Sequence, residues 1–414
     1  MTDTTPRFQK TTLASGIRVV SEHIPSVRSV AVGAWIAAGS RDEVPEENGM
    51  AHFIEHMVFK GTRRRRAHHI AQRMESVGGY LNAFTSKEYT CYYARGLDEH
   101  LDRALDVVLD LVVSPTLPER ELEKEKEVVV EEMKMYEDAP EDHVFDHYEA
   151  AMYPHHALGR PVLGVPETVR SFTRDRLLGY IDAKYAPNRL VVAVAGNVDH
   201  DKLVRRVEKL TAEIERAPQP VERLAVNGYD AVEHVERRPI QQAHLVIGAR
   251  ALGLDDPRRT VLTTLNTVLG GGMSSRLSQN IREKYGYCYN IYSFANMISD
   301  TGDFGVYMGT DAGKVERSRK LIGRELDKLA QRPVSPRALG QAKNQLKGSL
   351  MLGLESMSNR MMRLGRIELA FERYFTLDEV IASIDAVTAE EMQALAAELF
   401  APDRLSTVAI LPEA

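Results

Sequence analysis

The chain carries one short sequence pattern twice, and this internal repeat limits the folds that are open to it. Residues 185–190 read Tyr-Ala-Pro-Asn-Arg-Leu, and residues 400–405 read Phe-Ala-Pro-Asp-Arg-Leu, 215 positions later. Each copy follows a stretch with helical periodicity and precedes an apolar, strand-like run, and its proline ends the helix because proline lacks an amide proton. Solenoid repeats span only about 20 to 50 residues. The spacing therefore predicts two similar halves.

Other segments keep the same order in both halves. In the first half, an alternating strand pattern at 88–96 leads into a helical pattern at 97–113. In the second half, 302–309 leads into 314–330 in the same way. The connections are partly hairpin-like and partly helical. They favour an α+β fold in which each half is a mixed or antiparallel sheet packed against helices on one face.

A proline-rich polar stretch separates the two halves. It reads Arg-Ala-Pro-Gln-Pro-Val at 216–221 and is typical of a linker between domains. We therefore expect an N-terminal domain of residues 1–217 and a C-terminal domain of residues 218–414.

The composition is that of a globular protein outside the membrane. Hydrophobic residues make up 43% and charged residues 27% of 414 residues, and no apolar run approaches the about 18 residues that cross a bilayer. The polar first sixteen residues lack a secretory signal pattern, so we expect a cytoplasmic protein with no membrane partner. The two cysteines, Cys91 and Cys288, are expected to be reduced.

Four consecutive arginines, Arg63 to Arg66, are the one local basic cluster. A nucleic-acid patch is one interpretation, but the chain shows no nucleic-acid-binding motif, and its formal net charge of −6 disfavours a polyanionic partner. We interpret the cluster as a solvated loop or helix start and expect no nucleic-acid partner.

The pattern His52-x-x-Glu55-His56 lies in a stretch that predicts a helix. At 100° per residue the three side chains occupy one arc of roughly 100°. This order reverses the commoner His-Glu-x-x-His of zinc peptidases, and its glutamate can take a proton from a metal-bound water. A catalytic zinc needs three protein ligands, so one is missing. The alternative is a pair of partly buried helix histidines bonded to backbone or carboxylates.

An acidic helix at 119–137 is the natural source of the missing ligand. A carboxylate on its apolar face needs a partner, because an unpaired buried charge is costly. The spacing leaves four candidates open: Glu125, Glu127, Glu131 and Glu132.

Together these motifs resemble the pitrilysin-type metallopeptidases, in particular short bacterial members related to the catalytic subunit of the mitochondrial processing peptidase. The resemblance covers nearly the whole chain. It implies that Glu132 is the third ligand beside His52 and His56, that one zinc binds per chain, and that Glu125 helps to orient the site.

The resemblance also assigns residues to substrate binding. The segment Gly78–Thr85 matches the family's edge strand, in which Asn82 and Ala83 would pair with the substrate backbone. Phe59 matches an aromatic that lines the pocket for the residue after the cut. Asp142 and Asp146 match acidic positions that bind a substrate arginine.

In the second half, Leu269–Leu277 and Arg282–Tyr289 match the family strongly. The resemblance implies that Arg282 and Tyr289 hold the substrate near the scissile bond and help to stabilise the oxyanion. This half has no second His-x-x-Glu-His. Longer members hold four domains around a chamber, so this chain would form half of a clamshell. A homodimer would then complete each active site in trans.

We therefore expect a zinc-dependent endopeptidase that hydrolyses peptides, unfolded segments or leader segments, with Glu55 as general base. The alternative is a non-catalytic structural subunit of a processing-peptidase-like complex. Such subunits typically lose parts of the metal set, whereas this chain keeps all four residues, and we favour the enzyme.

Overall fold

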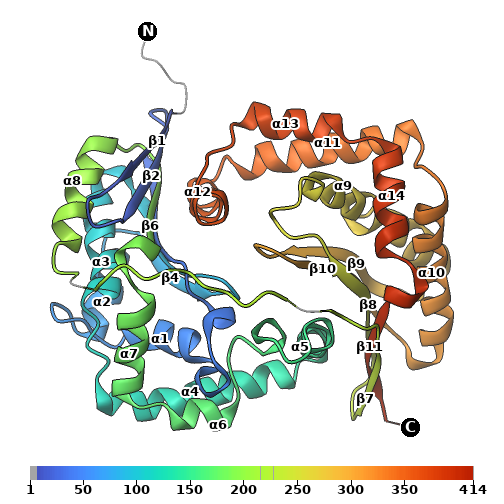
Figure 1. Cartoon of the computed structure of the whole chain (residues 1–414), viewed down its shortest axis with the longest axis horizontal. Coiled ribbons are helices and arrows are strands. Elements are labelled where there is room, and N and C mark those ends of the chain that lie inside the picture. The colour runs from blue at the N-terminus through green and yellow to red at the C-terminus, as the bar shows by residue number, and fades with distance from the viewer. Residues whose placement is uncertain (1–6, 215, 227, 414) are drawn as a thin grey trace. The chain divides into compact units, whose positions relative to one another are not determined.

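The computed structural model describes residues 7–214, 216–226 and 228–413, which divide into two compact units (Figure 1). The first unit holds the described residues of Met1–Lys134, Arg160–Leu224 and Gly353–Tyr374. The second holds those of Met135–Gly159, Ala225–Leu352 and Phe375–Ala414. Each unit thus takes one segment from the other half of the sequence.

The first unit is built on a six-stranded mixed sheet in the order β1-β2-β6-β3-β5-β4. Only the β2–β6 pair is parallel, and β4 forms one edge. The strands are β1 (Arg7–Thr12), β2 (Arg18–His23), β3 (Ser29–Ile36), β4 (Tyr80–Thr85), β5 (Thr90–Leu97) and β6 (Leu190–Gly196).

Both faces of this sheet are apolar. Alternate residues of a strand point to opposite sides of a sheet, so one strand shows both faces. On β3, Val30 and Val32 join the larger core, which the first-half helices supply. Trp35 joins a second core on the other face, with Met361 and Leu364. The first-half helices of this unit are α1 (Met50–Val58), α2 (Ala67–Glu75), α3 (Leu101–Val113), α4 (Glu119–Glu137), α6 (Pro166–Ser171), α7 (Arg174–Lys184) and α8 (His200–Thr211).

The helix on the second face, α12 (Met357–Phe371), comes from the far end of the chain. It lies so close to the sheet that glycine is needed on both sides. A Cβ at Gly33 would lie 2.5 Å from Met361 Sδ, and one at Gly365 would lie 2.2 Å from a ring carbon of Trp35.

The second unit is built on a five-stranded sheet in the order β7-β11-β8-β10-β9, in which only β7–β11 is parallel. Its strands are β7 (Glu233–Arg238), β8 (Ala243–Ala251), β9 (Cys288–Met297), β10 (Gly302–Thr310) and β11 (Ser406–Pro412). Its second-half helices are α9 (Arg259–Gly270), α10 (Val315–Gln331), α11 (Pro336–Gly353), α13 (Leu377–Ala386) and α14 (Ala389–Leu399).

A first-half helix, α5 (Pro140–Met152), belongs to the second unit. Its Val144 and Tyr148 pack with Val246 of β8 and Val408 of β11, on the face opposite to that of Leu245.

The predicted α+β class with two mixed sheets is confirmed. The prediction that helices cover only one face of each sheet is wrong. The sequence repeat begins a single turn of 3-10 helix at Pro187 and at Pro402, and β6 and β11 follow these turns. The second faces are covered by α12 and α5, because each sheet is apolar on both sides. The sequence division at 217/218 stays a prediction, and the spatial units depart from it in these two exchanged segments.

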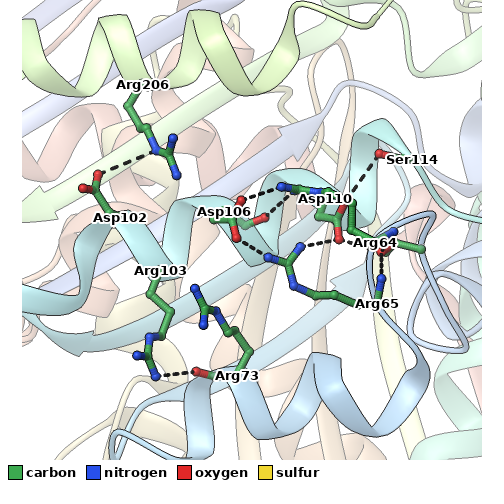
Figure 2. A network of polar contacts seen from close by, with 10 residues as sticks. Arg64, Arg65, Arg73, Asp102, Arg103, Asp106, Asp110, Ser114 and Arg206 are labelled. Carbon is green, nitrogen blue, oxygen red and sulfur yellow. Dashed lines mark hydrogen bonds and ion pairs between the residues drawn. The ribbon is translucent and has the colours of Figure 1, made fainter.

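Two of the four consecutive arginines form ion pairs with aspartates (Figure 2). Arg64 donates to Asp106 Oδ1 and Asp110 Oδ1 of α3 at 2.8 Å each, and Arg65 bonds the same two aspartates. The Asp110 side chain is fully buried. The arginines therefore anchor the loop after α1 to α3.

Neither cysteine forms a disulfide, as expected, and burial raises the pKa of both thiols. Among the described helices, none is both long and apolar enough to cross a membrane.

Candidate metal centre

The helix that carries the histidine motif is capped by a buried carboxylate. α1 begins after Gly49, whose φ is +93°, and a Cβ there would lie 2.5 Å from the Leu163 carbonyl oxygen. Glu43, 4% exposed, accepts hydrogen bonds from the amides of Gly49 at 2.9 Å and Ala51 at 2.8 Å. Its burial raises the pKa to about 8. Glu43 thus fixes the start of α1 two turns before His56.

Sequence reasoning missed Glu43. Its only signal is an acidic residue shortly before a glycine that starts a helix, and such residues are common.

The two motif histidines and Glu132 meet between α1 and α4. His56 Nε2 lies 3.4 Å and His52 Nε2 3.8 Å from the same oxygen, Glu132 Oε2. The three ligand atoms all lie within 4.8 Å of one another. The structure therefore brings together the three residues that the family resemblance implied as ligands.

His52 is held in the neutral form that a metal binds. It is 8% exposed, and burial, with a smaller contribution from His56, lowers its pKa to about 3. Its Nδ1 is buried without a hydrogen-bond partner among the described residues. In the tautomer that carries its hydrogen on Nδ1, the His52 ring presents a free Nε2 lone pair to Glu132.

His56 is oriented from its other side by Glu125. Glu125 Oε1 lies 2.9 Å from His56 Nδ1, and Glu125 Oε2 lies 2.6 Å from Lys60 Nζ. Burial favours neutral His56, but this hydrogen bond and the nearby Glu132 charge outweigh it and raise the pKa. With its Nδ1 hydrogen held by Glu125, the ring presents Nε2 to the centre.

Glu55 stands beside the ligands and is held by the edge strand. The hydroxyl of Thr85, the last residue of β4, donates to Glu55 Oε2 at 2.6 Å. Burial raises the pKa of Glu55, although the Thr85 bond opposes it. A carboxyl group with a raised pKa is suited to take and return a proton near neutral pH. The role of Thr85 also escaped sequence reasoning, because thirty residues separate it from Glu55.

Comparison with known proteins identifies the family. Residues 18–165 match the family described as Insulinase (Peptidase family M16), and residues 171–346 match the Peptidase M16 inactive domain. An uncharacterized zinc protease of Bacillus subtilis, YmxG, is 44% identical over 396 residues, 96% of each chain. The chain belongs to peptidase family M16. An uncharacterized zinc protease of Streptomyces coelicolor is 43% identical over 94% of this chain and 87% of its own.

Solved structures share the fold. A peptidase M16 inactive domain from Pseudomonas fluorescens superposes with a TM-score of 0.92 at 21% identity, over 99% of both chains. A protease from Helicobacter pylori gives 0.89 at 23% identity, over 98% of this chain and 100% of its own.

The donor set fits the zinc that the names of the M16 relatives imply. Two imidazoles and one carboxylate are a catalytic zinc set with room for one water. The convergence of both Nε2 atoms on Glu132 Oε2 supports the same conclusion.

The predicted substrate residues of the first unit lie on β4 or directly after α1, the elements that hold Thr85 and the histidine motif. Asn82 and Ala83 lie on the edge strand β4, which ends at Thr85, and Asn82 is exposed. Phe59 follows the last turn of α1, partly buried, with its ring 6.5 Å from that of Tyr92.

The remaining predicted residues belong to the second M16 unit. Arg282 lies in a π-helical turn, Ser278–Glu283, a form that occurs often at functional sites. Its guanidinium carbon lies 5.2 Å from the ring centre of Tyr289, which is 86% exposed. Asp142 and Asp146 lie on α5, which begins at Pro140, so the segment is helical despite its proline.

Proposed function

We propose that this M16 protein is a zinc-dependent endopeptidase that hydrolyses peptides and unfolded or leader segments. The single observation that carries the proposal is the placement of Glu55 beside a complete ligand set. His52, His56 and Glu132 converge on one point, and the Thr85 hydroxyl fixes the neighbouring Glu55 carboxylate.

His52, His56 and Glu132 would hold one catalytic zinc per chain. A zinc in such a site makes bound water acidic near neutral pH and polarises a peptide carbonyl. Glu55 would accept the proton of the attacking water and deliver it to the leaving amine, a role for which its raised pKa suits it. Glu125 holds the ring of His56 in one orientation through the Nδ1 hydrogen bond.

The exposed edge of β4 is suited to bind the substrate as an added strand. Such pairing satisfies substrate amides and carbonyls whatever the side chains are, which fits a peptidase with broad specificity. Asn82 and Ala83 would take this role, and Phe59 would line the pocket for the residue after the cut.

The second unit would contribute the other substrate groups. Arg282 and Tyr289, already paired through a cation–π contact, would hold the carbonyl near the scissile bond. Asp142 and Asp146 would select a basic residue shortly before the cut. We place the enzyme in the cytoplasm as a homodimer in which Arg282 and Tyr289 complete the partner's site.

A non-catalytic structural role is the competing proposal. The M16 family includes members named as inactive, such as the Pseudomonas fluorescens structure. An inactive subunit has no need of the buried base Glu55 and its Thr85 bond, and both are present here.

The test is cleavage of a quenched peptide, with zinc content measured in the same samples. Glu55→Gln should keep zinc and fold and lose activity by several orders of magnitude. Glu132→Gln should lose the catalytic zinc as well. Glu131→Gln is the matched control, because Glu131 is 67% exposed and pairs only with Lys134 in the described contacts. Near-normal turnover in Glu55→Gln would contradict the proposal.

A further inference from the structure

The second unit has its own group of potential metal ligands, although it lacks a His-x-x-Glu-His motif. His143 and His147 lie on α5, and Glu236 lies on β7. One ligand atom from each lies within 4.8 Å of the other two, and His147 Nε2 is 2.8 Å from Glu236 Oε2. The catalytic ligands meet the same 4.8 Å limit.

The helical period of α5 and the strand period of β7 bring these side chains together. His143 and His147 are four apart on a helix and share one face, with ring centres 4.5 Å apart. His234 and Glu236 are two apart on a strand and point to the same side. The His234 ring centre lies 5.1 Å from that of His147. A third imidazole therefore flanks the group.

Both elements are held firmly by other contacts. β7 pairs in parallel with β11, with His234 opposite Val408 and Glu236 opposite Ile410. Tyr148, next to His147 on α5, is fully buried against the same sheet and donates a hydrogen bond to the Phe304 carbonyl. The ligand positions are thus fixed by core packing and backbone pairing, which favours metal binding at low entropic cost.

The surroundings keep both imidazoles neutral. Burial lowers the pKa of His143, and Arg238 adds to the effect, while Glu236 and Glu137 oppose it. Burial also lowers the pKa of His147, with smaller contributions from its histidine neighbours. Zinc binds neutral imidazole, so neither ligand must first lose a proton at neutral pH.

One nitrogen in the group lacks a hydrogen bond. His143 Nδ1 is buried without a hydrogen-bond partner among the described residues, and Asp146 Oδ2 lies 3.9 Å away, beyond hydrogen-bond distance. Buried polar atoms are normally satisfied. An unsatisfied imidazole nitrogen beside a second histidine and a carboxylate indicates a missing ligand.

We propose that His143, His147 and Glu236 form a second metal site, distinct from the catalytic centre, that takes a divalent transition metal such as zinc. Two imidazoles and one carboxylate suit zinc, nickel or copper, whereas calcium and magnesium prefer oxygen ligands alone. The bound ion would join α5 to the edge strand β7. The competing outcome is a plain hydrogen bond between His147 and Glu236.

Metal titration of the full chain tests the proposal without reference to peptidase activity. The chain carrying His52→Ala and His56→Ala keeps the second group intact and removes the catalytic ligands. After treatment with a chelator, this variant should bind one equivalent of Zn²⁺, measured by elemental analysis after dialysis. With Co²⁺ it should give the absorption spectrum of a tetrahedral site. Adding His143→Ala and His147→Ala should abolish both signals.

Two further variants separate a metal site from adventitious binding and from misfolding. Glu236→Gln can still bond His147 but offers no carboxylate, so Zn²⁺ affinity should fall at least about tenfold. His68→Ala/His69→Ala is the control, because these neighbouring exposed histidines have ring centres only 3.8 Å apart. In the His52→Ala/His56→Ala background it should leave the single equivalent unchanged.

The proposal is overturned if the His52→Ala/His56→Ala chain, shown to be folded by circular dichroism, binds no more Zn²⁺ or Co²⁺ than the chain that lacks all four histidines. It is also overturned if Glu236→Gln binds Zn²⁺ as the parent does. Either result leaves the catalytic site untouched, since the Glu55→Gln assay tests that site separately.

Discussion

Glu125 connects His56 to Lys60: one of its oxygens lies 2.9 Å from His56 Nδ1 and the other lies 2.6 Å from Lys60 Nζ. The carboxylate belongs to α4, and both of its partners belong to the α1 region, so one side chain joins the two helices that carry the proposed metal ligands.

This arrangement predicts the effect of Glu125→Gln. The variant should bind zinc about 10- to 100-fold more weakly, because the ring of His56 loses its orientation and some of its basicity. Competition with a chromogenic chelator measures the affinity. Glu123→Gln is the control on the same helix, because Glu123 is 71% exposed. Equal affinities in the two variants would show that Glu125 does not position the ligand.

Thr85 should set the acid limb of the pH profile. Its hydrogen bond favours the charged form of Glu55 and so opposes the rise of that pKa. Thr85→Val removes the bond, so the pKa of Glu55 should rise further, since a hydrogen bond to the charged carboxylate favours the charged form. The acid limb of kcat/KM should then move to higher pH, and Thr85→Ser should restore it. An unmoved limb with normal zinc content contradicts this role.

Glu43 should make the stability of the metal-free chain depend on pH. Its folded-state pKa is raised to about 8 from an ordinary value of 4.5, so the folded state binds the proton more tightly than the unfolded state. The free energy of unfolding should therefore decrease as pH rises from about 4.5 to about 8, at up to about 1.4 kcal/mol per pH unit. Glu43→Gln, which does not titrate, should lack this decrease. Urea unfolding at several pH values makes the comparison.

Gly365 should be essential for the packing of α12. A Cβ there would meet the buried ring of Trp35 at 2.2 Å, so Gly365→Ala should destabilise the chain by about 1–3 kcal/mol. Gly348→Ala is the control, because Gly348 lies inside α11 with no atom within 4 Å of its added Cβ. That variant should be neutral or up to about 1 kcal/mol more stable. Thermal unfolding that ranks the two variants in the opposite order would contradict the packing described.

The proposed dimer predicts complementation between inactive chains. Tyr289→Phe should lower kcat by about 10²- to 10³-fold, as the loss of an oxyanion donor does, and Glu55→Gln should be inactive. If Arg282 and Tyr289 act on the partner's centre, a mixed dimer holds one intact site, and activity should return on mixing. A mixture that stays inactive despite subunit exchange, followed by native mass spectrometry, would show that each chain works alone or that Tyr289 is not catalytic.

The local part of the metal centre could be predicted from the sequence, because the helical period alone puts His52, Glu55 and His56 on one arc. The choice of Glu132 could not be made by spacing. Four glutamates of α4 were open, and which of them faces α1 depends on tertiary packing. Only the family resemblance selected the residue that the structure places 3.4 Å from His56.

Contacts between segments that are distant in the chain could not be predicted from the sequence. Glu43 and Thr85 act on α1 through a loop and a strand end, and neither position has a periodic signal. The faces covered by α5 and α12 were also missed, because an apolar helix stripe does not say which sheet it will cover. The group of His143, His147 and Glu236 needs the same long-range information, since 89 positions separate Glu236 from His147.

The exchange of α5 and α12 between the units has a consequence for synthesis of the protein. The far face of the first sheet, with Trp35 and Val191, is completed only by residues 357–371. While the ribosome makes the intervening chain, this apolar face has no helix of its own half to cover it. The nascent first half should therefore bind holdase chaperones, and it should become resistant to protease only after α12 has emerged.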